Sequence, residues 1–329
     1  MLGLKMFYDM SLRFFLVALI AVIFTSCEND SKLEKEIQSV EVDFIVERFD
    51  KAYLQAQTKD LPQLKQAYPF LFSKRVSDSI WIERIEDTLQ DLLLNEVSTS
   101  FKEFSEEKTN LNRLFQHLKY YDKTFKVPRV VTLTNDVDYR NKTIVTDTLL
   151  LIALDNFLGE DHEFYQNIPR YIAANMKPSQ IVPDITQNYA EKYSFQTDRK
   201  TLLDEMIYFG KLLYFKDIMI PNFSDADKIG YTEEQIQWAE ANESPIWSHF
   251  VENEMLYSTD RRLLNRFITD APFSKFYLQL DNESPGRLGQ YIGWQIVKAY
   301  ADKTGQKPLD ILQEEAEEIF NKAKFKPKK

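Results

Sequence analysis

Apolar residues recur at helical spacing along most of the chain, and a shorter central region follows a different pattern. Residues 79–96 and 111–121 place apolar side chains three or four positions apart, which predicts amphipathic helices. The same spacing returns after Gly159 and continues almost to the C-terminus. Three short apolar runs in the centre, bounded by polar turns, are typical of strands: residues 129–134, 142–146 and 149–154.

These patterns predict an α+β fold that is predominantly helical and contains a small central antiparallel sheet. A period-2 alternation nearer the N-terminus predicts one more strand, at Val40, Val42, Phe44 and Val46. Residues 232–235 (TEEQ) have the sequence of a capping box, which begins a helix. No linker-like segment divides residues 40–329, so we expect a single globular domain.

The N-terminal segment has the features of a lipoprotein export signal. Two basic residues precede eleven consecutive apolar residues, 14–24, and Cys27 follows the small residues 25–26. A transmembrane anchor is the alternative, but a helix that spans a bilayer needs about 20 residues. We therefore predict that residues 1–26 are removed and that Cys27 carries the lipid, such as palmitate. Residues 27–39 would then be a polar tether, with the domain facing the periplasm from a membrane.

Composition and charge argue against several classes of function. The net charge is −10, and it becomes −11 without residues 1–26, which hold two basic residues and one acidic residue. Such an acidic chain lacks the basic character that nucleic-acid binding requires. Cys27 is the only cysteine, so we expect neither an internal disulfide nor a cysteine nucleophile. We also expect no cofactor and no metal, because the three histidines are too scattered for a zinc site.

Candidate chemistry lies first in residues 201–221, a long apolar helix interrupted by Asp204 and Glu205. Carboxylates that are buried without partners are costly, so these two either face solvent or serve a site. Asp204, Tyr208 and Lys211 are spaced to share one face of the helix. This face could be a polar stripe on an otherwise buried helix, or it could line a functional cleft.

The second candidate segment, residues 281–300, holds three of the eight glycines of the chain: Gly286, Gly289 and Gly293. Glycine inside a helix costs about 1 kcal/mol relative to alanine. Three together suggest that another backbone or a ligand approaches this helix closely. Ser284 is placed to cap the helix, and Arg287 stands at its start. The segment could therefore serve helix packing or line a cleft.

Several stretches in order along the chain resemble the gliding-motility lipoprotein GldB family of Bacteroidetes-type bacteria. They include LFQHLKYYDKTFKVPRVVTLTNDVDYRN, MIYFGKLLYFKD, IGYTEEQIQWAEANE and APFSKFYLQLDNESPGRLGQYIGWQIV. The resemblance implies an envelope lipoprotein that supports gliding and the linked type IX secretion machinery. Its implied partners are other gliding and secretion proteins of the envelope and, through acylated Cys27, membrane lipid.

A more distant resemblance links the PGRLGQYIGWQIV helix to a family of bacterial zinc peptidases, whose upstream helix carries H-E-x-x-H. The matching stretch here is residues 204–208 (DEMIY), so Asp204 and Tyr208 stand where the two histidine ligands would be. The resemblance implies a zincin-like, degenerate metallopeptidase architecture and a non-enzymatic protein that acts by protein–protein interaction. The alternative is a periplasmic hydrolase of peptides or peptidoglycan that uses Glu205 as a general acid.

Three tripeptides are similar to the O-glycosylation sites of exported Bacteroidetes proteins. They are centred on Ser79, Thr88 and Thr148, each preceded by aspartate and followed by an apolar residue. The same tripeptides also cap helices, so both interpretations are open.

Overall fold

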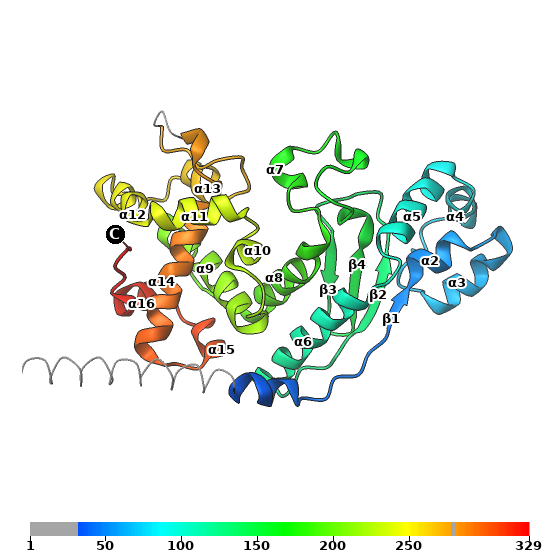
Figure 1. Cartoon of the computed structure of the whole chain (residues 1–329), viewed down its shortest axis with the longest axis horizontal. Coiled ribbons are helices and arrows are strands. Elements are labelled where there is room, and N and C mark those ends of the chain that lie inside the picture. Colours follow the sequence, from blue (N-terminus) through cyan, green and yellow to red (C-terminus); the bar gives the residue numbers. More distant parts are fainter. Residues whose placement is uncertain (1–31, 278–280, 329) are drawn as a thin grey trace, which may run out of the picture.

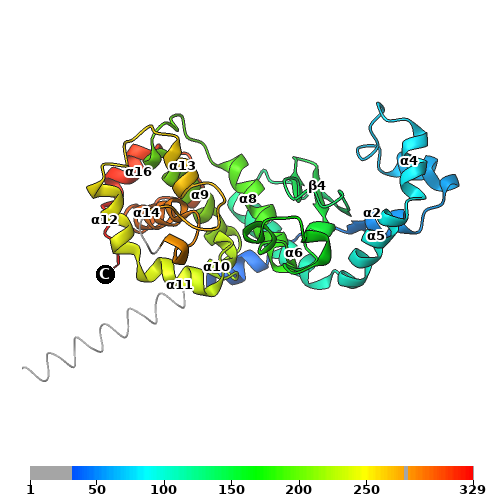
Figure 2. The ribbon, with the colours of Figure 1, turned by 90° about the horizontal axis from the view of Figure 1, so that it is seen from above.

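The structure is a computed structural model that describes residues 32–277 and 281–328. The molecule is elongated and has two lobes (Figure 1). The N-terminal lobe (residues 32–193) contains a small sheet with helices around it, and the C-terminal lobe (residues 202–328) is helical. Figure 2 shows the same arrangement from above. The predicted signal segment and Cys27 lie outside the described residues.

Four short strands form a mixed sheet in the order β1-β2-β4-β3. The strands are β1 (Val46–Arg48), β2 (Arg129–Leu133), β3 (Thr143–Val145) and β4 (Leu149–Ala153). β1 and β4 both pair parallel to β2, and the β3–β4 pair is antiparallel. The predominantly helical α+β class is confirmed, but the antiparallel direction expected for the whole sheet is wrong.

The connections explain the strand directions. A short turn joins β3 to β4, so these two strands must run antiparallel. β4 lies between β2 and β3, where its apolar sequence LLLIA is covered on both faces, and Leu150 and Ile152 are fully buried. The alternation at residues 40–46 does not form the predicted strand, because β1 begins only at its last residue, Val46.

The first helices after β1 lie beside the sheet (Figure 1). They are α2 (Phe49–Leu54), α3 (Leu61–Ala67), α4 (Asp78–Ile85), α5 (Thr88–Ser100) and α6 (Ser105–Tyr121). The helical stretch expected at residues 79–96 is broken between α4 and α5. There the carboxylate of Asp87 accepts the backbone N–H of Leu89 at 2.9 Å and caps α5.

The second half of the chain is almost entirely helical. Its helices are α7 (Arg170–Ala173), α8 (Ile181–Tyr193), α9 (Leu202–Met219), α10 (Asp225–Ile229), α11 (Glu233–Ala241), α12 (Glu243–Glu252), α13 (Arg262–Phe267), α14 (Leu288–Thr304), α15 (Pro308–Ile311) and α16 (Ala316–Ala323). Short 3₁₀ turns lie at η1 (Thr58–Asp60), η2 (Leu154–Asn156), η3 (Glu163–Tyr165), η4 (Pro178–Gln180) and η5 (Asp281–Glu283). The capping box expected at residues 232–235 is present at the start of α11. The main hydrophobic core is continuous from α6 and β4 to α9 and α14.

Glycines allow α14 to pack against its neighbours with the backbones in contact. A Cβ added at Gly293 would lie 1.7 Å from the carbonyl oxygen of Met206 on α9, and one added at Gly210 would lie 2.3 Å from the carbonyl carbon of Gly293. A Cβ at Gly286 would lie 2.2 Å from the oxygen of Ala271, and one at Gly289 would lie 2.8 Å from the oxygen of Phe267. Side chains at these positions would push α14 away from α9 and from the segment around α13.

The start of α14 differs from the predicted cap. The hydroxyl of Ser274 accepts the N–H of Leu288 at 3.2 Å, whereas the hydroxyl of Ser284 lies 2.7 Å from the carbonyl oxygen of Asp281. Ser284 therefore stabilises the preceding turn and does not cap the helix. Arg287 immediately precedes α14 with a φ of 59°, in the left-handed region that L residues rarely adopt.

The chain just after the predicted lipid site lies on the N-terminal lobe. Residues 32–38 are helical, and Ile37 is buried. The side-chain amide of Gln116 on α6 donates to the carbonyl oxygens of Gln38 (2.8 Å) and Val40 (3.1 Å). Of the expected tether, residues 32–39 are thus docked on α6. Within the described ranges, no helix is both long and apolar enough to cross a membrane.

Candidate functional site

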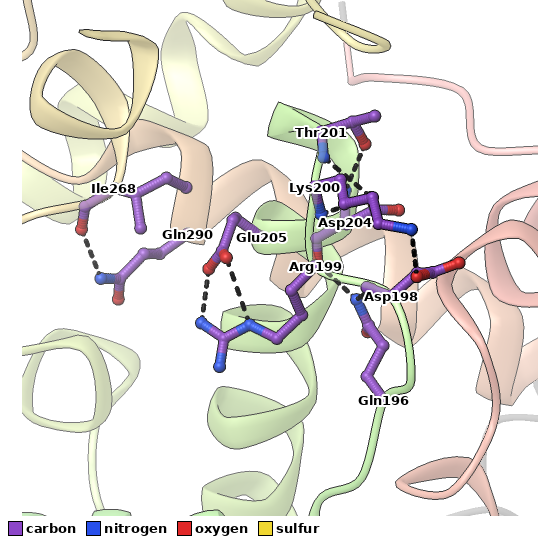
Figure 3. Close-up of polar contacts among 9 residues, drawn as sticks. All are labelled: Gln196, Asp198, Arg199, Lys200, Thr201, Asp204, Glu205, Ile268 and Gln290. Carbon is purple, nitrogen blue, oxygen red and sulfur yellow. Dashed lines mark hydrogen bonds and ion pairs between the residues drawn. The ribbon is translucent and has the colours of Figure 1, made fainter. Parts of the chain in front are cut away.

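The first two turns of α9 hold the residues that correspond to H-E-x-x-H, and the first carboxylate, Asp204, caps the helix (Figure 3). Oδ2 of Asp204 accepts the backbone N–H groups of Thr201 (2.8 Å) and Lys200 (3.0 Å). In return, the hydroxyl of Thr201 accepts the N–H of Asp204 at 3.1 Å. This reciprocal arrangement is a capping box, so Asp204 acts on the backbone of its own helix end.

The neighbouring carboxylate, Glu205, forms an ion pair with Arg199. Nε and Nη2 of Arg199 lie 3.2 Å and 2.5 Å from the two carboxylate oxygens of Glu205, whose side chain is only 12% exposed. The same guanidinium lies 3.5 Å from the ring centre of Tyr208, a cation–π contact. Burial raises the pKa of the Tyr208 hydroxyl. Glu205, Arg199 and Tyr208 therefore form one closed cluster.

The three positions do not converge on a common point. Asp204 and Glu205 leave the helix in different directions, the first toward the helix end and the second toward Arg199 (Figure 3). Across residues 32–277 and 281–328, no group of three or more His, Cys, Asp and Glu side chains is arranged to hold a metal ion.

The three histidines lie apart, each within its own local contacts. Nδ1 of His117 on α6 lies 2.8 Å from the carbonyl oxygen of Ile218, and burial lowers the pKa of this imidazole. His162 accepts the N–H of Phe164 at 3.3 Å and so caps η3. His249 packs edge-on against the ring of Phe276, with ring centres 4.9 Å apart.

Lys211, two turns further along α9, holds the C-terminal segment in place. It is fully buried, and its ammonium donates to the carbonyl oxygens of Phe195 (2.9 Å) and Glu314 (2.5 Å). Burial lowers its pKa to about 8. Asp204, Tyr208 and Lys211 thus each make a contact within the chain.

A cleft of about 410 Å³ opens between the lobes, beside a different face of α9. Phe209, Leu213 and Lys216 line it, at the spacing that continues the helix face of Glu205. We call it the interlobe cleft. The loop of residues 139–142, α7 and α8 contribute one side, and the end of α10, Asp270 and the start of α14 contribute the other.

Two of the cations in the interlobe cleft are mostly buried. Lys216 is 7% exposed, its ammonium donates to the carbonyl oxygen of Lys228 at 2.7 Å, and burial lowers its pKa to about 8. The Arg287 side chain is 18% exposed, and its guanidinium donates to the oxygen of Gly230 at 3.0 Å and lies 3.4 Å from Asp270.

Two further cations come from the loop after β2. Lys142 forms an ion pair with Asp184 of α8, and Arg140 stacks on the ring of Tyr139. The interlobe cleft is therefore lined by four basic side chains, Arg140, Lys142, Lys216 and Arg287, and by two acidic ones, Asp184 and Asp270. It is a region of net positive charge on a chain whose net charge is −10.

A comparison with known protein families shows which family the chain belongs to. The sequence pattern of the gliding motility protein GldB family matches residues 30–327. The chain belongs to the GldB family. No curated protein and no solved structure matches it, so the zincin-like architecture implied by the distant resemblance stays a prediction.

Membership of the GldB family makes this chain a gliding-motility lipoprotein, held to a membrane by its lipid. The match begins at residue 30, just after Cys27. The assignment of the lipid to Cys27 rests on the sequence, because this residue lies outside the described part of the chain.

The interlobe cleft was only partly visible in the sequence of this GldB family member. Arg287 lines the cleft, whereas Gly286, Gly289 and Gly293 lie against backbone. Sequence reasoning missed Lys216, although an ammonium inside the apolar run LLYFKDIM was a usable signal, because a buried charge needs partners. Arg140, Lys142 and Asp184 gave no such signal, since folding alone brings them together.

Proposed function

We propose that this GldB family member is a non-enzymatic envelope lipoprotein that supports gliding motility and the linked type IX secretion machinery by binding other envelope proteins. Its domain would face the periplasm, with the lipid on Cys27 supplying its location. One observation carries the non-enzymatic part of this proposal. Each of the three positions that correspond to H-E-x-x-H is engaged in a contact within the chain.

These contacts occupy the groups that catalysis would need. A general acid or base must reach the proton that it transfers, directly or through one water. Both carboxylate oxygens of Glu205 are held by Arg199, and the face of the Tyr208 ring is covered by the same guanidinium. Asp204 is directed at backbone amides. The arrangement therefore favours a structural role for the first two turns of α9.

Complementation of a deletion strain tests the proposal. We expect Glu205→Gln to restore colony spreading and secretion fully, at an abundance equal to wild type by immunoblot. Glutamine keeps the shape of the side chain and one acceptor for Arg199 but cannot act as a carboxylic acid. The matched control is Asp198→Asn, which makes the same charge change at an exposed ion pair with Lys200.

Loss of spreading and secretion in Glu205→Gln at normal abundance, with Asp198→Asn active, would contradict the proposal. It would show that the Glu205 carboxylate does more than pair with Arg199.

A further inference from the structure

We propose that the interlobe cleft binds an extended acidic peptide segment of a partner protein, with its carboxylates placed among Arg140, Lys216 and Arg287. This inference rests on the proposed role as a binding protein and names the chemistry of the bound segment.

The position of the cleft suits an extended segment. Its lining comes from both lobes: from the loop after β2, α7 and α8 on one side, and from α10 and the start of α14 on the other. Figure 1 shows these elements facing each other across the middle of the molecule. A volume of about 410 Å³ lies within the range of pockets that hold drug-sized ligands, so the cleft admits a short part of such a segment.

Charge in the cleft favours an anionic ligand. Within the described residues, the ammonium of Lys216 donates to a single acceptor, the oxygen of Lys228, so two of its three N–H donors are available. The contact between Arg287 and Asp270 is long, 3.4 Å, and the Asp270 side chain is 71% exposed. A carboxylate entering the cleft would gain charge-assisted hydrogen bonds from cations that are already partly desolvated.

Side-chain amides favour a peptide over a simple anion. Four of them line the cleft, and each uses its NH₂ group in a contact within the chain: Asn175, Gln180, Gln187 and Gln290. Figure 3 shows this for Gln290, whose nitrogen donates to the oxygen of Ile268. Their carbonyl oxygens accept no hydrogen bond from other described residues, so an oxygen that borders the cleft can accept one from a ligand N–H. Peptide backbone supplies such donors, whereas phosphate carries mainly acceptors.

Apolar side chains complete the match. Phe209, Leu213 and Ile229 line the cleft beside the basic groups. Apolar surface next to cations and amide acceptors complements a segment in which acidic and apolar side chains are mixed.

The test uses the full lipidated chain, purified in detergent, and a fluorescein-labelled peptide of alternating glutamate and leucine. Fluorescence anisotropy should show binding that weakens with salt. The same peptide with glutamine in place of glutamate should bind at least tenfold more weakly, because the charge-assisted contacts are lost.

Variants then locate the site. Arg140→Gln removes an exposed cation of the cleft and should weaken binding roughly threefold to fivefold, the range for exposed charge pairs. Lys216→Met should weaken it more, because this ammonium is mostly buried. The matched control Arg262→Gln removes an exposed cation outside the cleft and should leave affinity unchanged.

Three results would overturn the inference. The first is equal binding of the glutamate and glutamine peptides. The second is full retention of affinity in Arg140→Gln, whose exposed position leaves folding intact. The third is displacement of the peptide by millimolar inorganic phosphate, or by vesicles of anionic lipid, which would assign the cleft to phosphate groups. None of these outcomes depends on Glu205, so a failure here is distinct from a failure of the proposed function.

Discussion

Gly293 on α14 lies directly against the carbonyl oxygen of Met206 on α9. A Cβ added at Gly293 would lie 1.7 Å from that oxygen, far inside any contact distance. Backbone cannot rotate away as a flexible side chain can, so the two helices would have to separate. α9 and α14 are the central pair of the C-terminal lobe, and both belong to the main core. The packing of α9 against α14 thus depends on the absence of a Cβ at position 293.

We expect Gly293→Ala to lower the free energy of unfolding by about 3 kcal/mol. Overpacking against backbone outweighs the gain of about 1 kcal/mol that alanine brings to a helix. Urea denaturation followed by tryptophan fluorescence measures the change. Gly289→Ala is the matched comparison in the same helix. Its Cβ would lie 2.8 Å from the oxygen of Phe267, a milder clash, so this change should cost about 1 kcal/mol. Equal stability of Gly293→Ala and wild type would contradict the close packing of α9 and α14.

The capping role of Asp204 predicts a stability effect. Asp204→Ala removes the acceptor for the N–H groups of Lys200 and Thr201, and it should lower the free energy of unfolding by about 1 kcal/mol. Asp198→Ala, six residues earlier and exposed, should change it by less than about 0.5 kcal/mol. Urea denaturation of both variants compares them. A loss of stability in Asp198→Ala but not in Asp204→Ala would refute the capping role.

Acylation at Cys27 predicts a labelling result. The chain has no other cysteine, so Cys27→Ser should abolish incorporation of an alkyne-bearing palmitate analogue, detected by in-gel fluorescence. Ser26→Ala changes the adjacent residue, keeps the thiol and should remain labelled. Label retained in Cys27→Ser would place the lipid elsewhere.

Local pattern was enough to predict the helix that carries the candidate chemistry. The apolar run at residues 201–221 predicted α9 to within two residues at each end, because it is long and strongly apolar. The capping box of α11 could also be predicted from local sequence, because its two partners are only three residues apart. The sheet shows the limit of such reasoning. Strand direction depends on which strands become neighbours, and β4 enters between β2 and β3.

The site shows a similar limit. The acidic pair Asp204 and Glu205 was visible in the sequence, but their separate roles were not. Arg199 contacts Glu205 because the chain turns just before α9 and brings the two side chains together. The interlobe cleft depends on residues as far apart as Arg140 and Arg287. No spacing rule joins such positions, so the cleft could be found only in the folded chain.

The buried lysines of α9 predict an unusual pH dependence. Burial lowers the pKa of Lys211 and of Lys216 to about 8, against 10.5 for an exposed lysine. Between about pH 8 and pH 10.5 the unfolded chain therefore keeps protons that the folded chain has released. Stability rises with pH wherever the unfolded state binds more protons, by up to about 1.4 kcal/mol per pH unit for each group. We expect the free energy of unfolding to increase from pH 7.5 to pH 9.5.

The ionisation of buried tyrosines sets the upper pH limit of this measurement. Above about pH 10 buried tyrosines reverse the trend, because burial raises the pKa of groups such as Tyr214, to about 12, and the unfolded chain loses those protons first. Measurements therefore stop at pH 9.5.

Lys211→Met lowers stability at every pH by leaving the carbonyl groups of Phe195 and Glu314 without their donor. It should also remove roughly half of the slope, whereas Lys200→Met, at an exposed lysine, should keep all of it. An unchanged slope in Lys211→Met would show that this buried ammonium keeps an ordinary pKa, and that its contacts with the backbone carbonyls fully offset the cost of burial.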